Sequence, residues 1–317
     1  MRTRPLVEVS VRELGPLLQD ECLHWNAELY WDYSDVSSAV ASGLERRALA
    51  GCVIQDGLKL AAYCYYMLDA GRAVVGSVYS AEAFRGRGLE ESLLERVLAD
   101  AQAIPGNDRV ECQTLFSTAR AADDLFTRAG FQSRTRHYLV RSLSQGRPPA
   151  PAPARVRLRP LGREDLVVAA QIVHRSHEGS LDAALNLTYA TPALCRGFVE
   201  TLVLRAGCGR FDSEASFIAE ERGLPVGVLL ASHLSATNGH VCQVSVSPEA
   251  QGRGLGTVLV TSALEAFRRQ GLATASLSVT LENRRAYGLY TRLGFRVRKE
   301  FAAHAWLRPP ARIALPA

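Results

Sequence analysis

The stretch VCQVSVSPEAQGRGLGTVLVTSALEAFRRQ, residues 241–270, decides how the fold is interpreted. Its first part is rich in β-prone residues and reaches Ser247-Pro248. Because proline has no N–H to donate to a strand ladder, we expect a strand to end there. Its last part carries apolar residues at helical spacing from Leu255 to Phe267, and Gly271 follows, as is typical just past a helix end. The stretch therefore predicts a strand, a glycine-rich loop and a helix.

The loop carries three glycines, at 252, 254 and 256. A glycine lets the backbone approach a ligand without a Cβ atom in the way. The first N–H groups of the following helix point towards the loop, and the helix dipole favours negative charge there. The spacing is neither the GxGxxG of a dinucleotide-binding turn nor the Gly-Lys-Ser/Thr ending of a P-loop. The sequence predicts a phosphate site of another kind.

The same motifs occur twice in the chain. FRGRGLE at 84–90 resembles AQGRGLG at 250–256, and LFTRAGF at 125–131 resembles LYTRLGF at 289–295. Two similar motifs in the same order indicate an internal duplication.

A Pro/Ala-rich segment separates the two copies. Its sequence, SQGRPPAPAPAR at 144–155, lacks helical or strand periodicity and is typical of an extended linker. We therefore expect a domain over residues 1–143, the linker over 144–155, and a second domain over 156–317.

Composition narrows the class of protein. The chain has 317 residues, 47% of them hydrophobic, and a formal net charge of +5. No apolar run reaches the roughly 20 residues of a membrane span, and the N-terminus has no apolar signal core. The arginines are spread out, which argues against nucleic-acid binding. The seven cysteines form no C-x-x-C pair. We expect a cytoplasmic protein with reduced thiols, no metal, no membrane partner and no nucleic-acid partner.

Two motifs carry a family resemblance. Gln251-x-x-Gly254-x-Gly256 at a strand–helix junction resembles the acyl-CoA pyrophosphate loop of the GCN5-related N-acetyltransferase (GNAT) superfamily. NRRAYGLY at 283–290 is similar to the N-x-x-A-x-x-L-Y motif of that family. The tandem architecture also resembles that of the mycothiol synthases. The resemblance covers nearly the whole chain.

The resemblance implies an α/β (α+β) fold class with two tandem GNAT folds. Each is a mixed, mostly antiparallel twisted sheet flanked by helices, in the order β-αα-βββ-α-β-α-ββ. The periodicity along each half agrees with that order. At the end of the second half it predicts two separate strands, over 295–300 and 304–307.

The resemblance also implies the reaction and its residues. We expect an acetyl-CoA-dependent N-acetyltransferase that acts on a primary amine, of a small molecule, by direct attack in a ternary complex. Tyr290 is the implied general acid, because a phenol with a pKa of about 10 is protonated at neutral pH and can donate to the leaving thiolate. Asn283 either contacts the cofactor or caps its helix, and the two roles are compatible. The implied cofactor-binding residues are Val244, Ser245 and Val246 along the pantetheine arm, Gln251, Gly252, Arg253, Gly254, Leu255, Gly256 and Thr257 around the pyrophosphate, and Asn283.

The general base stays open. An alkylammonium is almost entirely protonated at pH 7 and cannot attack, so a base or a water relay is needed. We expect Glu282 in that role. The other candidates near the expected cleft are Glu220, Glu221, His233 and His240.

The loop over 174–182 is expected to cover the acceptor site. Its Glu178 and Asp182 either meet a cationic acceptor or are solvated loop charges. His174 and His177 lack further ligands at metal-binding spacing.

The first half departs from the family motif. Glu90 replaces the last loop glycine, where a carboxylate would repel a phosphate, and Phe126 replaces the tyrosine. We expect a degenerate first domain without acetyltransferase chemistry. The segment over 22–33, with aromatic residues from 25 to 33, either lines a pocket for a cationic or ring-bearing acceptor or forms an aromatic plug between the two domains.

Two other functions remain open. One is acetylation of a protein or peptide N-terminus, and the other is a non-catalytic acyl-CoA-binding sensor or scaffold. We expect a monomer or a homodimer.

Overall fold

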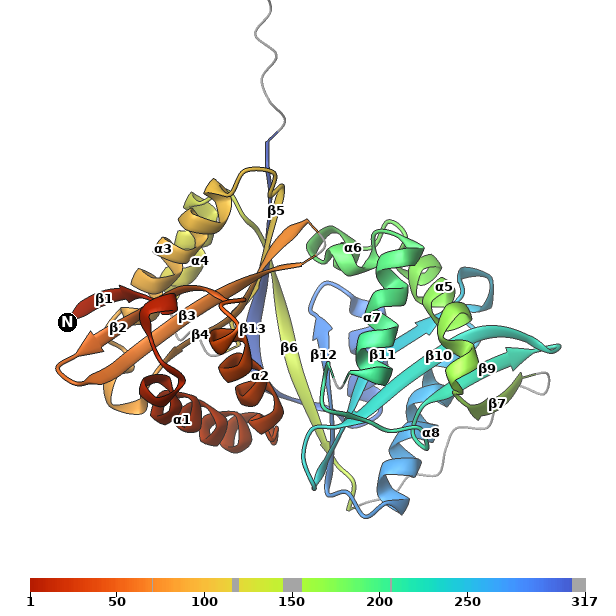
Figure 1. Cartoon of the computed structure of the whole chain (residues 1–317). Helices are drawn as coiled ribbons and strands as arrows, with labels where there is room; N and C mark the ends of the chain where they lie inside the picture. The colour runs from red at the N-terminus through yellow and green to blue at the C-terminus, as the bar shows by residue number, and fades with distance from the viewer. Residues whose placement is uncertain (70, 116–119, 145–155, 206, 310–317) are drawn as a thin grey trace, which may run out of the picture. The chain divides into compact units, whose positions relative to one another are not determined.

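The computed structural model describes residues 1–69, 71–115, 120–144, 156–205 and 207–309 (Figure 1). Apart from Ser144, the predicted linker lies outside the described residues. Contacts divide the chain into two compact units. Unit 1 comprises residues 1–21, 36–134 and the chain from 301 on, and unit 2 comprises residues 22–35 and 135–300.

Unit 1 is built on a sheet in the order β1-β2-β3-β4-β5-β13. Its neighbouring strands are antiparallel, except that β4 and β5 are parallel. The strands are β1 (Arg2–Pro5), β2 (Ala50–Asp56), β3 (Lys59–Asp69), β4 (Arg72–Ser80), β5 (Arg109–Gln113) and the last part of β13 (Arg296–Leu307). The helices are α1 (Val11–Leu29), which continues into unit 2, α2 (Ser34–Glu45), α3 (Leu89–Ala103) and α4 (Arg120–Arg128).

Helices cover both faces of this sheet. A continuous run of apolar residues, as in β3, puts apolar side chains on both faces of a strand, and both must be buried. Because successive side chains of a strand point to opposite faces, Ala62 and Cys64 pack with α3, whereas Tyr63 and Tyr65 pack with α1 and α2. The two hydrophobic clusters form a three-layer arrangement, with the sheet between α3 and the α1–α2 pair.

Unit 2 is built on a sheet in the order β7-β9-β10-β11-β12-β6-β13, and β8 pairs with β10. β11 and β12 pair in parallel, whereas β10 with β8, β9 and β11, β12 with β6, and β7 with β9 pair antiparallel. The strands are β6 (Gln132–Ser142), β7 (Val156–Pro160), β8 (Arg210–Phe211), β9 (Phe217–Glu221), β10 (Leu224–His233), β11 (Asn238–Val246) and β12 (Thr274–Thr280). The helices are α5 (Leu166–His177), α6 (Leu181–Leu185), α7 (Pro192–Leu204), α8 (Leu255–Arg269) and α9 (Arg284–Arg292).

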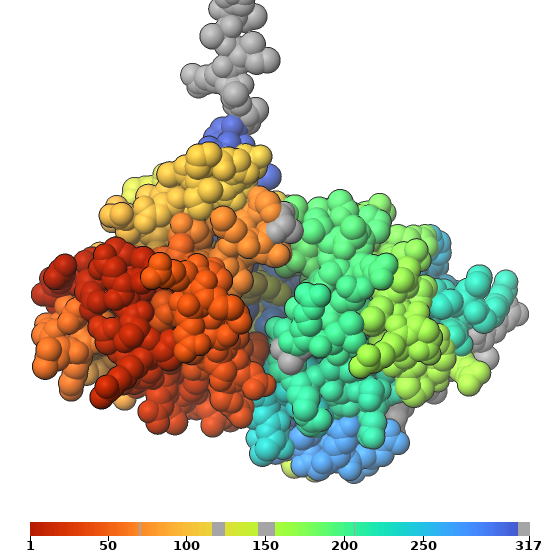
Figure 2. Space-filling model, viewed as in Figure 1, coloured from red at the N-terminus to blue at the C-terminus, as the bar shows by residue number. Residues whose placement is uncertain are grey.

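The sheet of unit 2 also has two covered faces. Along β10, Val228 and Leu230 pack with α5 and α7, while Leu229 and Ala231 pack with α8. Figure 2 shows the side chains of α5, α6 and α7 (green) as a continuous layer on one side of this unit. The fold class predicted from the sequence, a mixed and mostly antiparallel sheet flanked by helices, is confirmed in each unit.

The prediction of two strands at the end of the chain is wrong. Residues 296–307 form the single strand β13, and the polar residues inside it do not interrupt the strand. Its part from Ala303 to Leu307 pairs with β5 in unit 1.

A strand from the first half of the sequence belongs to unit 2. β6 pairs antiparallel with β12, from Arg136 opposite Thr280 to Ser142 opposite Thr274. Leu139 of β6 and Leu143, which directly follows the strand, are buried in the cluster under α8. The two units therefore do not follow the sequence order of the halves, and the domain boundaries at 143 and 156 stay a prediction.

Among the described residues, no helix combines the length and the apolar character that a membrane crossing requires.

The placement of β6 in unit 2 gives a first prediction. Leu139→Ala leaves a cavity in the core under α8, and a Leu→Ala change in a core costs about 2–5 kcal/mol of stability. We expect hydrogen–deuterium exchange to accelerate in β12 and α8 but not in β2 to β4. Leu94→Ala, which removes a fully buried leucine of unit 1, is the matched control and should have the opposite pattern. Faster exchange confined to unit 1 in Leu139→Ala would contradict the assignment.

Candidate active site

The site begins where two parallel strands separate. β11 and β12 pair from Asn238 opposite Thr274 to Val241 opposite Leu277. β11 then continues to Val246 along β10, without further described pairing to β12. The backbone groups of residues 244–246 on that side are thus available to a ligand that lies in extended form along the strand.

A glycine loop joins β11 to α8 at the open end of this gap. Gly252 and Gly254 have φ values of +81° and +83°, a region that favours glycine. Gly254 is the N-cap of α8, and no side chain caps the first turn. An added Cβ at Gly254 would meet nothing within 4 Å. The loop therefore presents the N-terminus of an α-helix to open space, which suits an anion.

A cleft of about 590 Å³ connects these features within unit 2. It brings together the general acid expected from the sequence, Tyr290, and nearly all of the expected cofactor-binding residues. Those that line it are Val244, Ser245, Val246, Gln251, Gly252, Gly254, Leu255, Gly256, Thr257 and Asn283. Arg253 and Glu282 are not among the lining residues.

The charged side chains near the loop differ from the expected ones. Arg253 turns to Glu221, with 2.7 Å between its Nη1 and Oε1 of the glutamate. Arg285 and Arg292 of α9 line the cleft instead. Arg285 Nη1 donates to Oε1 of Gln251 at 2.8 Å. The sequence signal for these two arginines was their separation of seven residues, about two helical turns, which places them on one face of the helix that follows Asn283.

Asn283 caps α9 as well as lining the cleft. Its Oδ1 accepts a hydrogen bond from the N–H of Ala286 at 3.2 Å. A cap of this kind fixes where α9 begins. It thereby sets the position of Tyr290 two turns further along the helix.

Tyr290 lines the cleft with a free hydroxyl. Among the described residues, that hydroxyl has no hydrogen-bond partner. Burial raises the pKa of Tyr290 to about 12, and the negative charge of Asp182 adds to the rise. The phenol is therefore protonated at neutral pH, and its proton is available for donation.

The opposite wall comes from the end of α5 and the start of α6. His177 and Asp182 both line the cleft. Oδ1 of Asp182 accepts from the Thr280 hydroxyl at 2.5 Å. Nδ1 of His177 lies 2.8 Å from the carbonyl oxygen of Val173, which can only accept, so Nδ1 carries the hydrogen and Nε2 holds a lone pair. Burial also lowers the pKa of His177, and the ring stacks on Tyr189.

The expected base, Glu282, is exposed in the turn before α9. Its role stays a prediction. The other candidates from the sequence are engaged or buried: Glu220 pairs with Arg159 at 2.6 Å, Glu221 with Arg253 at 2.7 Å, His233 with Asp212 at 2.8 Å, and burial lowers the pKa of His240 to about 3.

The aromatic segment over 25–33 packs upon itself within unit 2. Trp25 stacks on Tyr33 with ring centroids 4.1 Å apart, and Trp31 meets Trp25 edge-on at 5.1 Å. The backbone N–H of Asp32 donates to the carbonyl of Leu234 at 2.7 Å. None of these residues lines the cleft. These rings therefore pack on one another away from the cleft, and the aromatic plug between the domains stays a prediction.

The related loop in unit 1 has a different environment. Glu90 is buried at the start of α3, and Phe126 is fully buried, with its ring 3.5 Å from that of His304. The hollow beside this loop holds about 300 Å³. Its lining includes the carboxylates of Glu91, Glu95 and Asp124 and the guanidinium of Arg128. Unit 1 thus offers net negative charge where unit 2 offers arginines.

Solved structures share this fold. A tandem GNAT protein from the clavulanic acid biosynthesis pathway aligns with a TM-score of 0.67 at 15% identity, over 98% of this chain and 99% of the other. A GCN5-related N-acetyltransferase from Sphaerobacter thermophilus aligns with a TM-score of 0.63 at 22% identity, over 86% of each chain. At these identities the likeness concerns the fold alone.

Sequence comparisons identify the family. The model of the acetyltransferase (GNAT) family matches residues 13–131 and again 190–295. A mycothiol acetyltransferase of a Parafrankia species is 31% identical over 247 residues, which is 72% of this chain and 73% of the relative. The mycothiol acetyltransferase of Gordonia bronchialis is 28% identical over 79% of this chain and 87% of its own length. The chain is therefore an N-acetyltransferase and belongs to the acetyltransferase (GNAT) family.

Proposed function

We propose that this chain transfers the acetyl group of acetyl-CoA to a primary amine of a small molecule, in the cleft of the second half, within a ternary complex. The observation that carries the proposal is the meeting of three features in one cleft. They are the gap between β11 and β12, the glycine loop at the start of α8, and the phenol of Tyr290.

The donor fits the cleft from the loop inwards. GNAT acetyltransferases in general use acetyl-CoA. The pyrophosphate would lie at the N-terminus of α8, near Arg285 and Arg292, and the pantetheine arm along Val244 to Val246. The first placement brings the negative pyrophosphate to positive charge. The second lets the amides of the pantetheine arm pair with the strand backbone.

The reaction needs three proton movements. The ammonium first gives one proton to a base, and the free amine nitrogen then attacks the carbonyl carbon. The carbon–sulfur bond breaks, the leaving thiolate takes the proton of Tyr290, and the second proton that the nitrogen loses returns to the tyrosinate. We place Asp182 ahead of Glu282 as the base, because Asp182 is the one carboxylate among the residues that line this cleft. Its negative charge also favours a cationic acceptor.

The acceptor is proposed to be a small molecule on the strength of the relatives, whose name is mycothiol acetyltransferase. The alternatives are a protein or peptide N-terminus, and a sensor that binds acyl-CoA without turnover.

A thiol-release assay with acetyl-CoA separates these functions. We expect turnover with at least one member of a panel of small primary amines. Turnover only with peptides would favour the second function. Binding of acetyl-CoA without turnover on either panel would favour the sensor.

Tyr290→Phe tests the general acid in this assay. We expect kcat to fall by about 10²-fold, the usual contribution of general acid catalysis, with the Kd for acetyl-CoA nearly unchanged. Because the pKa of Tyr290 is raised to about 12, the acid form persists below that pH, and wild-type kcat should not decline between pH 7 and 10. Tyr287→Phe is the matched control, since Tyr287 lies on the same helix with its hydroxyl 3.3 Å from His137. Equal loss in both variants would remove Tyr290 from the mechanism.

Gly256→Glu tests where the phosphate binds, and a titration of the wild type tests how many acetyl-CoA sites the chain has. A carboxylate about 5 Å from a phosphate costs roughly 3 kcal/mol at an effective dielectric constant of 20, or about 10²-fold in Kd. Gly256→Gln has the same shape without the charge and serves as control. Isothermal titration of the wild type should give one acetyl-CoA per chain, because unit 1 presents carboxylates at the related position. Two sites of similar affinity would contradict the assignment.

Paired variants test the base. An amine with a pKa of about 10 loses its own proton as the pH rises, so loss of the base matters most at low pH. We expect Asp182→Asn to lower kcat/KM at pH 7 by at least 10-fold and to recover much of it at pH 10. Glu282→Gln should leave both values close to wild type. The reverse pattern would return the role to Glu282.

A further inference from the structure

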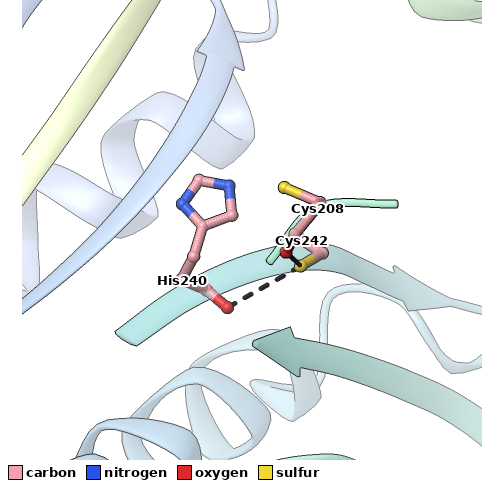
Figure 3. Close-up of side chains that lie close together, drawn as sticks. All are labelled: Cys208, His240 and Cys242. Carbon is pink, nitrogen blue, oxygen red and sulfur yellow. Dashed lines mark hydrogen bonds between the residues drawn. The ribbon is translucent and has the colours of Figure 1, made fainter. Parts of the chain in front are cut away.

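A cluster outside the cleft lining contains two cysteines and a histidine (Figure 3). Cys208 lies in the segment between α7 and β8, and His240 and Cys242 lie on β11. Their potential ligand atoms all lie within 4.8 Å of one another. We propose that Cys208, His240 and Cys242 bind one divalent metal ion of the zinc class. The sequence had indicated no metal site, since Cys208 is remote in sequence from the other two.

The strand explains why His240 and Cys242 share a side. Residues two apart in a strand point to the same face. Val241 between them packs in the cluster under α8, whereas Cys242 packs towards the cluster of α5 and α7. A β-bulge occurs at this point. Val241 pairs with Ala231 and Gln243 pairs with Leu230, so Cys242 has no paired residue in the register with β10. Bulges re-aim side chains and are frequent next to functional sites.

The third ligand, Cys208, lies close to β11 because its backbone contacts Cys242. The thiol of Cys242 lies 3.9 Å from the carbonyl oxygen of Cys208, so the segment that carries Cys208 is held against the strand. In Figure 3 the sulfur of Cys208 and the ring of His240 lie on the same side of β11. The ligand set thus joins a loop to the central strand of unit 2.

The contacts of the imidazole are compatible with the form that a metal requires. Nδ1 of His240 lies 2.9 Å from the hydroxyl of Ser276. That hydroxyl donates its hydrogen to the carbonyl of Gly239 at 3.3 Å and also accepts from Nδ2 of Asn238 at 3.0 Å. With the Ser276 hydrogen on the carbonyl of Gly239, Nδ1 is the donor to Ser276, and Nε2 keeps its lone pair for the metal. A hydrogen bond to the second ring nitrogen is the usual support of a metal-binding histidine.

The spacing and chemistry favour zinc-class ions. With bonds of about 2.3 Å to sulfur and 2.0 Å to nitrogen, tetrahedral ligand atoms lie about 3.5–3.8 Å apart, which is compatible with the observed limit. Two thiolates balance the charge of a dication, and thiolate with imidazole selects against Mg²⁺ and Ca²⁺. Cys208 and Cys242 are partly exposed, which provides an entry path. Three protein ligands leave a fourth position for water or another donor.

Cobalt substitution tests the site on the full-length protein. We expect the reduced, chelator-treated protein to take up one equivalent of Co²⁺, with a thiolate charge-transfer band and the strong visible bands of tetrahedral cobalt. One equivalent of Zn²⁺ should displace it. Cys208→Ser, Cys242→Ser and His240→Gln should each weaken binding by at least 10²-fold. Ser276→Ala should weaken it by about 10- to 100-fold.

Cys195→Ala is the matched control. Cys195 is fully buried in α7 of the same unit and is not one of the three ligands, so its loss should leave the cobalt spectrum unchanged. A measurement on the wild type needs no variant: Zn²⁺ should protect Cys208 and Cys242, but not Cys22, from alkylation. Absence of a cobalt band, or the same band in both ligand-cysteine variants, would overturn the proposal. So would a reduced protein in which Zn²⁺ leaves the alkylation of Cys208 and Cys242 unchanged.

Discussion

The separation of β11 from β12 after Val241 and Leu277 is the constraint on which the site depends. Parallel strands end at the same edge of a sheet, and here each is followed by a helix that starts at that edge, α8 after β11 and α9 after β12. The gap exposes strand backbone, and the helix starts place a glycine loop and the Asn283 cap beside it. The cleft is therefore a consequence of strand geometry, to which the side chains of α9 and the α5–α6 turn are added.

Local sequence predicted the parts of the site that depend on neighbours along the chain. The glycine loop, the strand before it and the Asn283-to-Tyr290 motif each lie in one short segment, so their chemistry is visible in the sequence. The family resemblance placed the loop over 174–182 at the acceptor site but left open whether Asp182 faces the cleft, because His177 and Asp182 reach it through the packing of α5 and α6. The Cys208–His240–Cys242 cluster depends on a loop held against a strand. The spacing of residues along the chain does not predict contacts between segments that are distant in sequence. The single strand β13 was missed for a related reason, because its partners lie far away in sequence.

The two glycine loops show how one backbone motif acquires different chemistry. Both keep glycines with positive φ and a left-handed N-cap before the helix, Gly88 in unit 1 and Gly254 in unit 2. The surrounding charges differ in sign, since carboxylates gather beside the first loop and arginines beside the second. A helix N-terminus supplies only about half a unit of positive charge, so neighbouring side chains decide whether an anion binds.

The placement of β6 has a consequence for how this protein evolves. Its residues are encoded before the linker, yet they complete the sheet and core of the unit that carries the cleft. A deletion that removed the first copy of the duplication would also remove this strand and leave the edge of β12 unpaired. The copy that lacks the tyrosine and the last loop glycine is thus still required, because it supplies β6 to the sheet of unit 2. Substitutions at Glu90 or Phe126 leave β6 in place, whereas deletion of the whole copy does not.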